Sequence, residues 1–182
     1  MREGSGLSEI RTPRLLLRRA RMEDLQAIHA VLSNAQAMRY WSTLPHATVA
    51  QSRAWLASMI DVPPEGNADF VIEHEGTVIG KAGCWRLPEI GFILHPDYWH
   101  RGLAREAVGA AIDHAFAHFD IAAIVADVDP RNIASLKLLE RLGFRETHRA
   151  ARTFVVGDEH CDSVYLTCAR PGAPTSAPAC SI

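Results

Sequence analysis

Apolar residues follow two spacings along this chain, and the spacing predicts where strands and helices lie. Residues 70–74 and 77–85 are largely apolar runs of strand length, separated by a Glu-Gly pair at 75–76. Such runs around a tight glycine turn predict a β-hairpin. Residues 89–94 predict a further strand of the same antiparallel sheet, and residues 14–19 predict an earlier strand after a polar leader.

Two helices are predicted before the hairpin, because their apolar residues recur every three or four positions. Residues 22–24 open the first helix and place acidic side chains where the helix dipole favours negative charge. Its inward positions are Leu25, Ile28, Val31 and Leu32. The second helix is predicted for residues 48–60, with Val49, Trp55, Leu56 and Met59 facing inward.

The second half of the chain alternates helices and strands. Residues 103–119 carry apolar residues at helical spacing, and residues 121–128 form a mostly apolar run. Such a run predicts a strand that is covered on both faces. Because a helix separates this strand from the strand at 89–94, we expect the two strands to be parallel, with a right-handed crossover.

The last predicted elements are one helix and one hairpin. The helix opens at residues 129–132, and Gly143 followed by Phe144 is suited to end it. The hairpin strands are predicted at residues 155–156 and 163–167. The inward positions of the helix are Leu136, Leu139 and Leu142.

A short loop between the strand at 89–94 and the helix at 103–119 reads Trp-His-Arg-Gly-Leu-Ala at residues 99–104. A glycine-containing loop at a helix start points several backbone N–H groups at one spot, where the helix dipole favours an anion. Arg101 and Arg105 add positive charge. The loop therefore predicts a phosphate site, and its length fits a diphosphate. As a bare motif it also fits an ordinary tight corner, and it is neither a Walker A loop nor a three-glycine dinucleotide fingerprint.

Composition narrows the class of protein. The chain has 182 residues, 48% of them hydrophobic, with a net charge of -2 and a pI near 6.5. These values predict one domain over residues 1–170, and they argue against nucleic-acid and membrane-surface partners. Residues 171–182 are rich in Pro, Ala and Ser and are expected to form a flexible tail. Without a long apolar run or a signal-peptide core, we expect a cytoplasmic protein.

The cysteines give no sign of a metal site or a disulfide framework. Cys84, Cys161, Cys168 and Cys180 lack close paired spacing, so we expect reduced thiols. His160 beside Cys161 has nothing nearby to complete a tetrahedral set, and no metal is predicted.

The order of motifs is more specific than any one of them. After the strand and the Arg-Gly-x-Ala loop come a helix, a strand, an Asn-x-x-Ser helix start at 132–135 and Leu-Gly-Phe at 142–144. This order resembles the GNAT superfamily of acetyl-CoA-dependent N-acetyltransferases. Residues 12–18, 89–92 and 129–135 look like the Rim-type branch, named for acetylation of ribosomal-protein N-termini.

The resemblance covers residues 11–169 and implies an α/β (α+β) fold. We expect a mixed, mostly antiparallel central sheet with splayed parallel strands, flanked by helices. It implies that acetyl-CoA (coenzyme A) is the co-substrate, with its pyrophosphate on the loop amides and its pantetheine arm along the strand. The residues implied are Phe92, Ile93, Leu94, His100, Arg101, Gly102, Leu103, Ala104, Arg105 and Asn132. His100 is a departure, because close relatives often carry glycine there and a histidine with positive φ is strained.

The chemistry of acetyl transfer adds two catalytic candidates. An amine must be neutral to attack a thioester, so a base must take its proton, and a proton donor helps the thiolate leave. Glu89 is the expected base, with Glu146 as its rival, and Ser135 is the expected donor. The backbone N–H of Leu94 or a neighbour is expected to bind the carbonyl oxygen.

Each of these residues also has a simpler explanation. Glu89 fits an ordinary strand-end carboxylate, Ser135 a helix-surface hydroxyl and Asn132 a helix N-cap. Tyr40, Trp41 and Trp85 are expected to line the acceptor pocket, although core packing explains tryptophans equally well.

The expected function is transfer of the acetyl group of acetyl-CoA to a primary amine by direct attack in a ternary complex. The acceptor is a protein N-terminus, which calls for an open groove, or a small-molecule amine, which calls for a closed acidic pocket. The alternatives are a non-catalytic acyl-CoA-binding sensor module and a phosphate-binding protein for another nucleotide. A homodimer is a further expectation, because dimers are common among the proteins this chain resembles.

Overall fold

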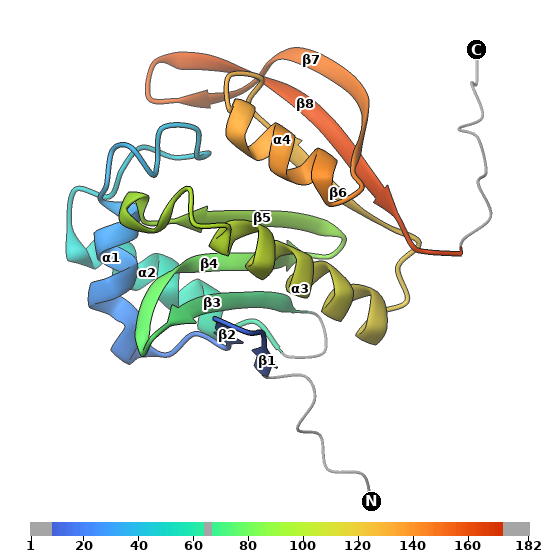
Figure 1. The fold of residues 1–182 in the computed structure, drawn as a ribbon. Helices are drawn as coiled ribbons and strands as arrows, with labels where there is room; N and C mark the ends of the chain where they lie inside the picture. The colour runs from blue at the N-terminus through green and yellow to red at the C-terminus, as the bar shows by residue number, and fades with distance from the viewer. Residues whose placement is uncertain (1–8, 64–66, 173–182) are drawn as a thin grey trace, which may run out of the picture.

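The computed structural model describes residues 9–63 and 67–172, and within these ranges eight strands form one sheet (Figure 1). The order across the sheet is β1-β2-β3-β4-β5-β6-β8-β7. Neighbours are antiparallel except β5 and β6, which are parallel, so the expected mixed sheet is confirmed. The strands are β1 (Glu9–Arg11), β2 (Leu16–Arg18), β3 (Ala68–His74), β4 (Thr77–Arg86), β5 (Glu89–Leu94), β6 (Ala123–Val128), β7 (Arg145–Val156) and β8 (Glu159–Ala169).

Helices cover both faces of the sheet (Figure 1). One face carries α1 and α2, whose apolar side chains pack with Val71, Val78 and Ile93 of the sheet. The other face carries α3 and α4, which share an apolar cluster with both halves of the sheet. The helices are α1 (Leu25–Leu32), α2 (Val49–Ile60), α3 (Leu103–His118) and α4 (Ile133–Arg141), with 3-10 turns η1 (Met22–Asp24) and η3 (Pro96–Tyr98).

Several element ends follow directly from local sequence. The turn between β3 and β4 has positive φ at both central residues, Glu75 (51°) and Gly76 (79°), as a type I′ hairpin turn requires. At the start of α2, the side chains of Thr48 and Gln51 each bond the other's backbone N–H. Gly143 ends α4 with φ 93°, and the N–H of the buried Phe144 donates to the Leu139 carbonyl at 3.1 Å.

The parallel strands β5 and β6 separate soon after they meet. In the described ranges their register contains a single pair, Glu89 with Val125, and the Val125 N–H donates to the Pro88 carbonyl at 3.0 Å. Beyond this pair β5 and β6 diverge, as Figure 1 shows. The expected splay of the two parallel strands is therefore present.

The core is continuous across this splay. Ile90 and Leu94 of β5 belong to the same buried cluster as Val108 of α3, Ile124 of β6 and Val164 of β8. The helix α3 packs on β3, β4 and β5, and its Gly109 lies against Leu142 at the end of α4. The two helices therefore form one packed layer that joins the halves of the sheet where strand pairing is missing.

Three sequence expectations about the elements need correction. The polar leader was expected to have no regular structure, but its residues 9–11 pair with β2 as an edge strand. The final hairpin is much longer than residues 155–156 and 163–167, because β7 is an exposed edge strand whose mostly polar and charged side chains give no apolar signal. Val49 does not face inward: it is 36% exposed in the first turn of α2.

The prediction that β6 is covered on both faces is also wrong. Only Ile124, Ala126 and Val128 are buried, and they share one face of the strand. The alternate residues, including Asp127, face the opposite side. This second face looks into the cavity described below.

Other expectations concern what the chain lacks. In the part that the structure describes, no group of side chains could hold a metal ion and no helix is long and apolar enough to cross a bilayer. Cys84, Cys161 and Cys168 carry free thiols, and burial raises the pKa of Cys84 to about 12. Cys180 and most of the predicted tail, residues 173–182, lie outside the described ranges.

Candidate active site

The loop before α3 has two residues in the left-handed backbone region. His100 has φ 59° and Gly102 has φ 76°. A histidine tolerates this region better than most residues with a side chain, though at a cost. His100 thus takes up the strained conformation itself, where the chain turns into α3.

The backbone N–H groups of this loop are free of protein acceptors. Within residues 9–63 and 67–172, no protein group accepts a hydrogen bond from the N–H of any residue from 100 to 105. The first such bond of α3 comes from the Glu106 N–H, to the Gly102 carbonyl at 3.2 Å. Unsatisfied N–H groups at a helix start carry partial positive charge and bind anions. The loop thus fits a diphosphate.

Arg14 fixes the loop from the side. Its guanidinium donates to the Arg101 carbonyl at 2.8 Å and binds the Glu106 carboxylate at 2.7 Å. A Cβ atom on Gly102 would lie 3.4 Å from the Arg14 Nη2 atom. Arg101 itself lies over the Tyr98 ring at 5.6 Å, while Arg105 is exposed. Three cationic side chains therefore surround the free N–H groups.

The edge of β5 that faces the splay presents alternate backbone groups. The His95 N–H donates to the Ile79 carbonyl of β4 at 2.8 Å. In an antiparallel ladder, bonding to one neighbour alternates with residue number, so Ile93 also bonds β4. The backbone N–H and C=O groups of Phe92 and Leu94 therefore point the other way, towards the splay. The Leu94 carbonyl accepts from the indole of Trp99 at 2.9 Å.

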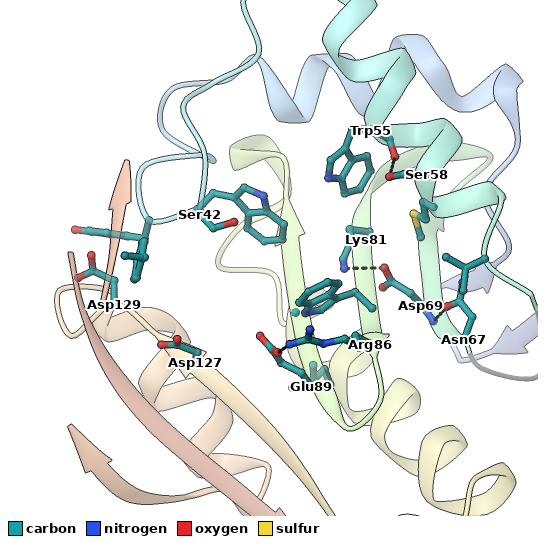
Figure 2. A pocket seen from close by; sticks show the side chains of 18 of the residues that line it. Ser42, Trp55, Ser58, Asn67, Asp69, Lys81, Arg86, Glu89, Asp127 and Asp129 are labelled. Carbon is teal, nitrogen blue, oxygen red and sulfur yellow. Dashed lines mark hydrogen bonds and ion pairs between the residues drawn. The ribbon is translucent and has the colours of Figure 1, made fainter. Parts of the chain in front are cut away.

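A cavity of about 820 Å³ lies beside this splay, on the side of the sheet that carries α2 (Figure 2). We call it the central cavity. Tyr40, Trp41 and Trp85, the three aromatic residues expected around an acceptor, all line it. Glu89, the expected base, lines it as well. The other lining aromatic residues are Trp55, Phe154 and Tyr165.

Tyr40 links the two sides of the central cavity. Its ring lies between two guanidinium groups, with Arg39 at 5.3 Å and Arg131 at 5.8 Å from the ring centroid. Arg131 belongs to the segment between β6 and α4, where it binds Asp129 at 2.6 Å and also pairs with Glu159. Tyr40, from the first half of the chain, therefore contacts Arg131, from the second half.

Four carboxylates line the central cavity, and three of them have cationic partners. Asp69 pairs with Lys81 at 2.8 Å, Glu89 with Arg86 at 3.4 Å, and Asp129 with Arg131. Asp127 has no ion-pair partner among the described residues. Figure 2 shows it across the cavity from the pair formed by Asp69 and Lys81.

The pKa of Asp127 is raised from its ordinary value. Crowding by the cavity walls raises it first and the charge of Glu89 raises it further, whereas a hydrogen bond with Ser163 and the nearby His148 oppose the shift. Asp127 nevertheless keeps an exposed surface on β6, so it is open to a group bound in the cavity. The arrangement can hold an ammonium group and accept a proton from it.

The other predicted catalytic and binding residues lie elsewhere. Glu146 is on β7 outside the lining of the central cavity, where the Arg149 guanidinium bonds its carboxylate at 2.8 Å and lowers its pKa. Asn132 acts as a helix N-cap, because its side chain accepts from the Ser135 N–H at 3.2 Å. Ser135 is half-buried in the first turn of α4 and does not line the cavity.

Sequence reasoning missed Asp127, Asp69 and Lys81. Lys81 and Asp127 are charged residues inside runs that predict strands, which is an available signal of a site, and Asp69 directly precedes such a run. The predicted hairpin already brings Asp69 and Lys81 together. What the sequence could not supply is the position of Asp127 on β6, across the splay from this pair.

Comparisons with known proteins identify the family. A family model described as an acetyltransferase (GNAT) domain matches residues 14–145. The uncharacterized N-acetyltransferase p20 of Bacillus licheniformis is 31% identical over 144 residues, which cover 74% of this chain and 81% of that protein.

Solved structures share the fold. The spermidine N-acetyltransferase of Vibrio cholerae, in complex with CoA and spermine, has a TM-score of 0.72 at 23% identity, covering 87% of this chain and 96% of that one. RimL, a ribosomal L7/L12 alpha-N-protein acetyltransferase, has a TM-score of 0.79 at 18% identity, covering 90% and 94%.

Proposed function

The chain belongs to the GNAT acetyltransferase family and is an acetyl-CoA-dependent N-acetyltransferase, and from that premise we propose that its acceptor is a small primary amine bound in the central cavity. One observation carries the proposal: Asp127, a carboxylate without an ion-pair partner among the described residues, lies in an aromatic cavity beside the splay. Aromatic faces and carboxylates both attract an ammonium group.

In this proposal Glu89 and Asp127 act as a pair on the acceptor. Together they attract the ammonium form and orient it towards the splay. Asp127 takes the proton that must leave before the nitrogen can attack, because its raised pKa makes it a stronger base than an ordinary aspartate. Glu89 pairs with Arg86 at 3.4 Å and supplies the second carboxylate of the pair.

The co-substrate site takes the loop and the edge of β5. Acetyl-CoA supplies an activated acyl thioester when bound. The N–H groups of residues 100–105 hold its diphosphate, and the outward backbone groups of Phe92 and Leu94 align the pantetheine arm, as an added strand is aligned. Asn132 still has its amide NH₂ to offer this arm. The Leu94 N–H, on the same edge, is the donor for the carbonyl oxygen.

Ser135 is the proposed proton donor to the departing thiolate. Its hydroxyl is in the first turn of α4, where the helix dipole favours negative charge. A Ser135→Ala variant is therefore expected to lose turnover more than acetyl-CoA affinity.

The cytoplasmic location stays part of the proposal, in keeping with the free thiols of the described cysteines. The homodimer stays a prediction.

Acetyl transfer to a panel of amines tests the proposal. With a small primary amine, mass spectrometry is expected to find the acetylated product and a thiol assay one CoA per product. Asp127→Asn is expected to lower kcat by about 10²–10⁴-fold, the usual contribution of a general base.

Glu89→Gln removes the repulsion that raises the pKa of Asp127, so the lower limb of the kcat–pH profile should move to lower pH.

Glu146→Gln is the matched control, because this carboxylate lies outside the central cavity. It is expected to retain wild-type kcat and pH dependence. Acetyl-CoA binding without thiol release for any amine would identify a sensor module instead. Loss of activity in Glu146→Gln, with Asp127→Asn active, would move the base to β7.

A further inference from the structure

A buried ion pair forms part of the wall of the central cavity. The Lys81 ammonium on β4 lies 2.8 Å from the Asp69 Oδ2 atom on β3, and the two side chains are 2% and 6% exposed. Trp55 and Ser58 of α2 lie beside the pair, as Figure 2 shows. Burying two charges costs free energy that their attraction offsets only in part. Stability alone therefore does not explain why this pair is buried, and a role in function is the better explanation.

The hydrogen-bonding capacity of this pair is not used up by the protein. The Asp69 Oδ1 atom is buried and has no partner among the described residues. The Lys81 ammonium donates one hydrogen bond, to Asp69, and therefore has two N–H groups to spare. A buried carboxylate oxygen without a donor costs about 1–3 kcal/mol or more, which a bound group with a suitable donor would recover.

The pair is open to the rest of the central cavity through a position without a side chain. A Cβ atom on Gly91 would lie 3.8 Å from the Lys81 Nζ atom and 3.8 Å from Trp85. Gly91 is on β5, two residues beyond Glu89 on the same face of the strand. A ligand held at Glu89 and Asp127 can therefore extend past Gly91 to Lys81 and Asp69.

We propose that Asp69 and Lys81 form a second subsite, which binds an uncharged polar group of the acceptor that both donates and accepts hydrogen bonds, such as a terminal carboxamide. The donor meets the Asp69 carboxylate, whose buried Oδ1 atom turns towards the cavity when the ligand enters, and the acceptor meets a spare N–H of Lys81. A second ammonium group fits poorly, because Lys81 repels it from the same carboxylate. The acceptor is thus a small amine with a carboxamide at its far end, rather than a linear polyamine. This inference rests on the proposed function.

The subsite suits a small molecule better than a protein N-terminus. Both side chains are almost completely buried, so a group that reaches them needs to end there. A terminal carboxamide is the last group of a small molecule. The amide of a peptide bond is followed by more chain, which would need a path out of the cavity.

A panel of acceptors tests the subsite in the wild-type protein. Amines with a terminal carboxamide are compared with alkylamines and with diamines over a series of methylene chain lengths. At the best length, kcat/KM for the carboxamide is expected to exceed that for both matched amines by about 10–100-fold. Equal values, a preference for the diamine, or a preference for a peptide with the same amine and amide would overturn the proposal.

The double variant Asp69→Leu/Lys81→Met tests the residues themselves. Both charges are removed together, because one left alone would be an unpaired buried charge. The ratio of kcat/KM for carboxamide over alkylamine is expected to fall towards one. The control Glu9→Gln/Arg11→Met removes an exposed ion pair outside the cavity and should keep the wild-type ratio.

The outcomes separate the two proposals. A ratio that persists in the Asp69→Leu/Lys81→Met variant would remove the subsite and leave the acetylation of small amines standing. If no amine is acetylated at all, the proposed acceptor class fails, and this inference fails with it. Should the double variant not fold, the wild-type panel still decides.

Discussion

At the scale of single residues, two buried polar atoms that lack a hydrogen-bond partner identify side chains with a role in binding or in the pH dependence of stability. The Asp69 Oδ1 atom and the His114 Nε2 atom are both buried without a hydrogen-bond partner in the described ranges. Asp69 faces the central cavity, where a ligand can supply the donor. His114 instead packs edge-on against Phe70 and stacks on His118, with ring centroids 4.1 Å apart. The burial of His114 therefore affects the stability of the fold rather than ligand binding.

His114 is expected to make the protein less stable in mild acid. Burial first, and then the neighbouring His118, lower the pKa of His114 from 6.5 to about 4 in the folded protein. The unfolded chain binds this proton first, so its stabilising contribution is complete above pH 6.5 and is lost as the pH falls towards 4. We expect a loss of about 3 kcal/mol in the free energy of unfolding over this window.

Urea unfolding at several pH values measures this effect. The variant His114→Phe keeps an aromatic ring in the core and cannot be protonated, so its stability should depend less on pH in the same window. His148→Gln, at an exposed position on β7, is the control and should follow the wild type. Parallel pH curves for wild type and His114→Phe would show that another group is responsible.

At the scale of elements, the start of α3 combines backbone strain with anion-binding geometry. His100 and Gly102 accept positive φ values so that the following N–H groups converge. Arg14 then fixes the loop through the Arg101 carbonyl and the Glu106 carboxylate. The loop therefore has its shape before any ligand arrives, which saves the free energy of ordering it on binding.

Gly102→Val is expected to weaken acetyl-CoA binding by at least about tenfold. The new side chain has φ 76° to tolerate, and its Cβ atom approaches Arg14 at the place proposed for the diphosphate. Gly76→Val is the matched control, because it imposes the same strain at φ 79° in the hairpin turn, where a Cβ atom meets nothing within 4 Å. Calorimetric titration that finds equal affinities for both variants would argue against the loop site.

The elements that sequence reasoning located carry local signals. The turn at Glu75 and Gly76 and the helix end at Gly143 each need particular residues, and each is where it was predicted. The helix predicted from residue 48 begins there too, with Thr48 as its cap. The edge strand β1 and most of β7 were not predicted, because a strand with little buried surface has no apolar pattern. Apolar spacing alone also placed Val49 inward, although it is exposed in the first turn of α2.

The candidate site was predictable only in part, for a related reason. The loop at residues 99–104 is contiguous, so the sequence displays its glycine and arginines together. The central cavity is assembled from strands far apart in the chain. Asp127 is separated from Asp69 and Lys81 by whole elements, and only the strand order brings it to the same cavity.

At the scale of the whole molecule, one side chain adds to the pairing of the last strand with the middle of the chain. The strand β8 pairs with β6, and the Arg170 guanidinium beyond it donates to the carbonyls of Ile121 at 2.9 Å, Phe116 at 2.7 Å and Phe119 at 2.5 Å. These carbonyls lie at the end of α3 and in its connection to β6. Arg170 therefore joins the end of β8 to α3, which packs on the first half of the sheet.

Arg170→Ala is expected to lower the free energy of unfolding by about 1–3 kcal/mol, because several carbonyls lose a charged donor. Arg170→Lys should recover part of this loss, since a lysine keeps the charge but not the fork of donors. Urea unfolding measures both. Arg149→Ala, which removes an exposed pair on β7, is expected to change little. Equal stability of Arg170→Ala and wild type would contradict the proposed fastening.

The splay also protects the protein from a common hazard of β-structure. Unpaired strand backbone usually sits at the rim of a sheet, where it invites other chains to join and starts aggregation. Here the backbone groups of Phe92 and the N–H of Leu94, which no strand pairs, lie in the interior of the sheet, flanked by β6. A slender ligand can enter this slot, but a second folded chain cannot. The molecule can thus keep a strand edge permanently available for its reaction without becoming a template for fibres.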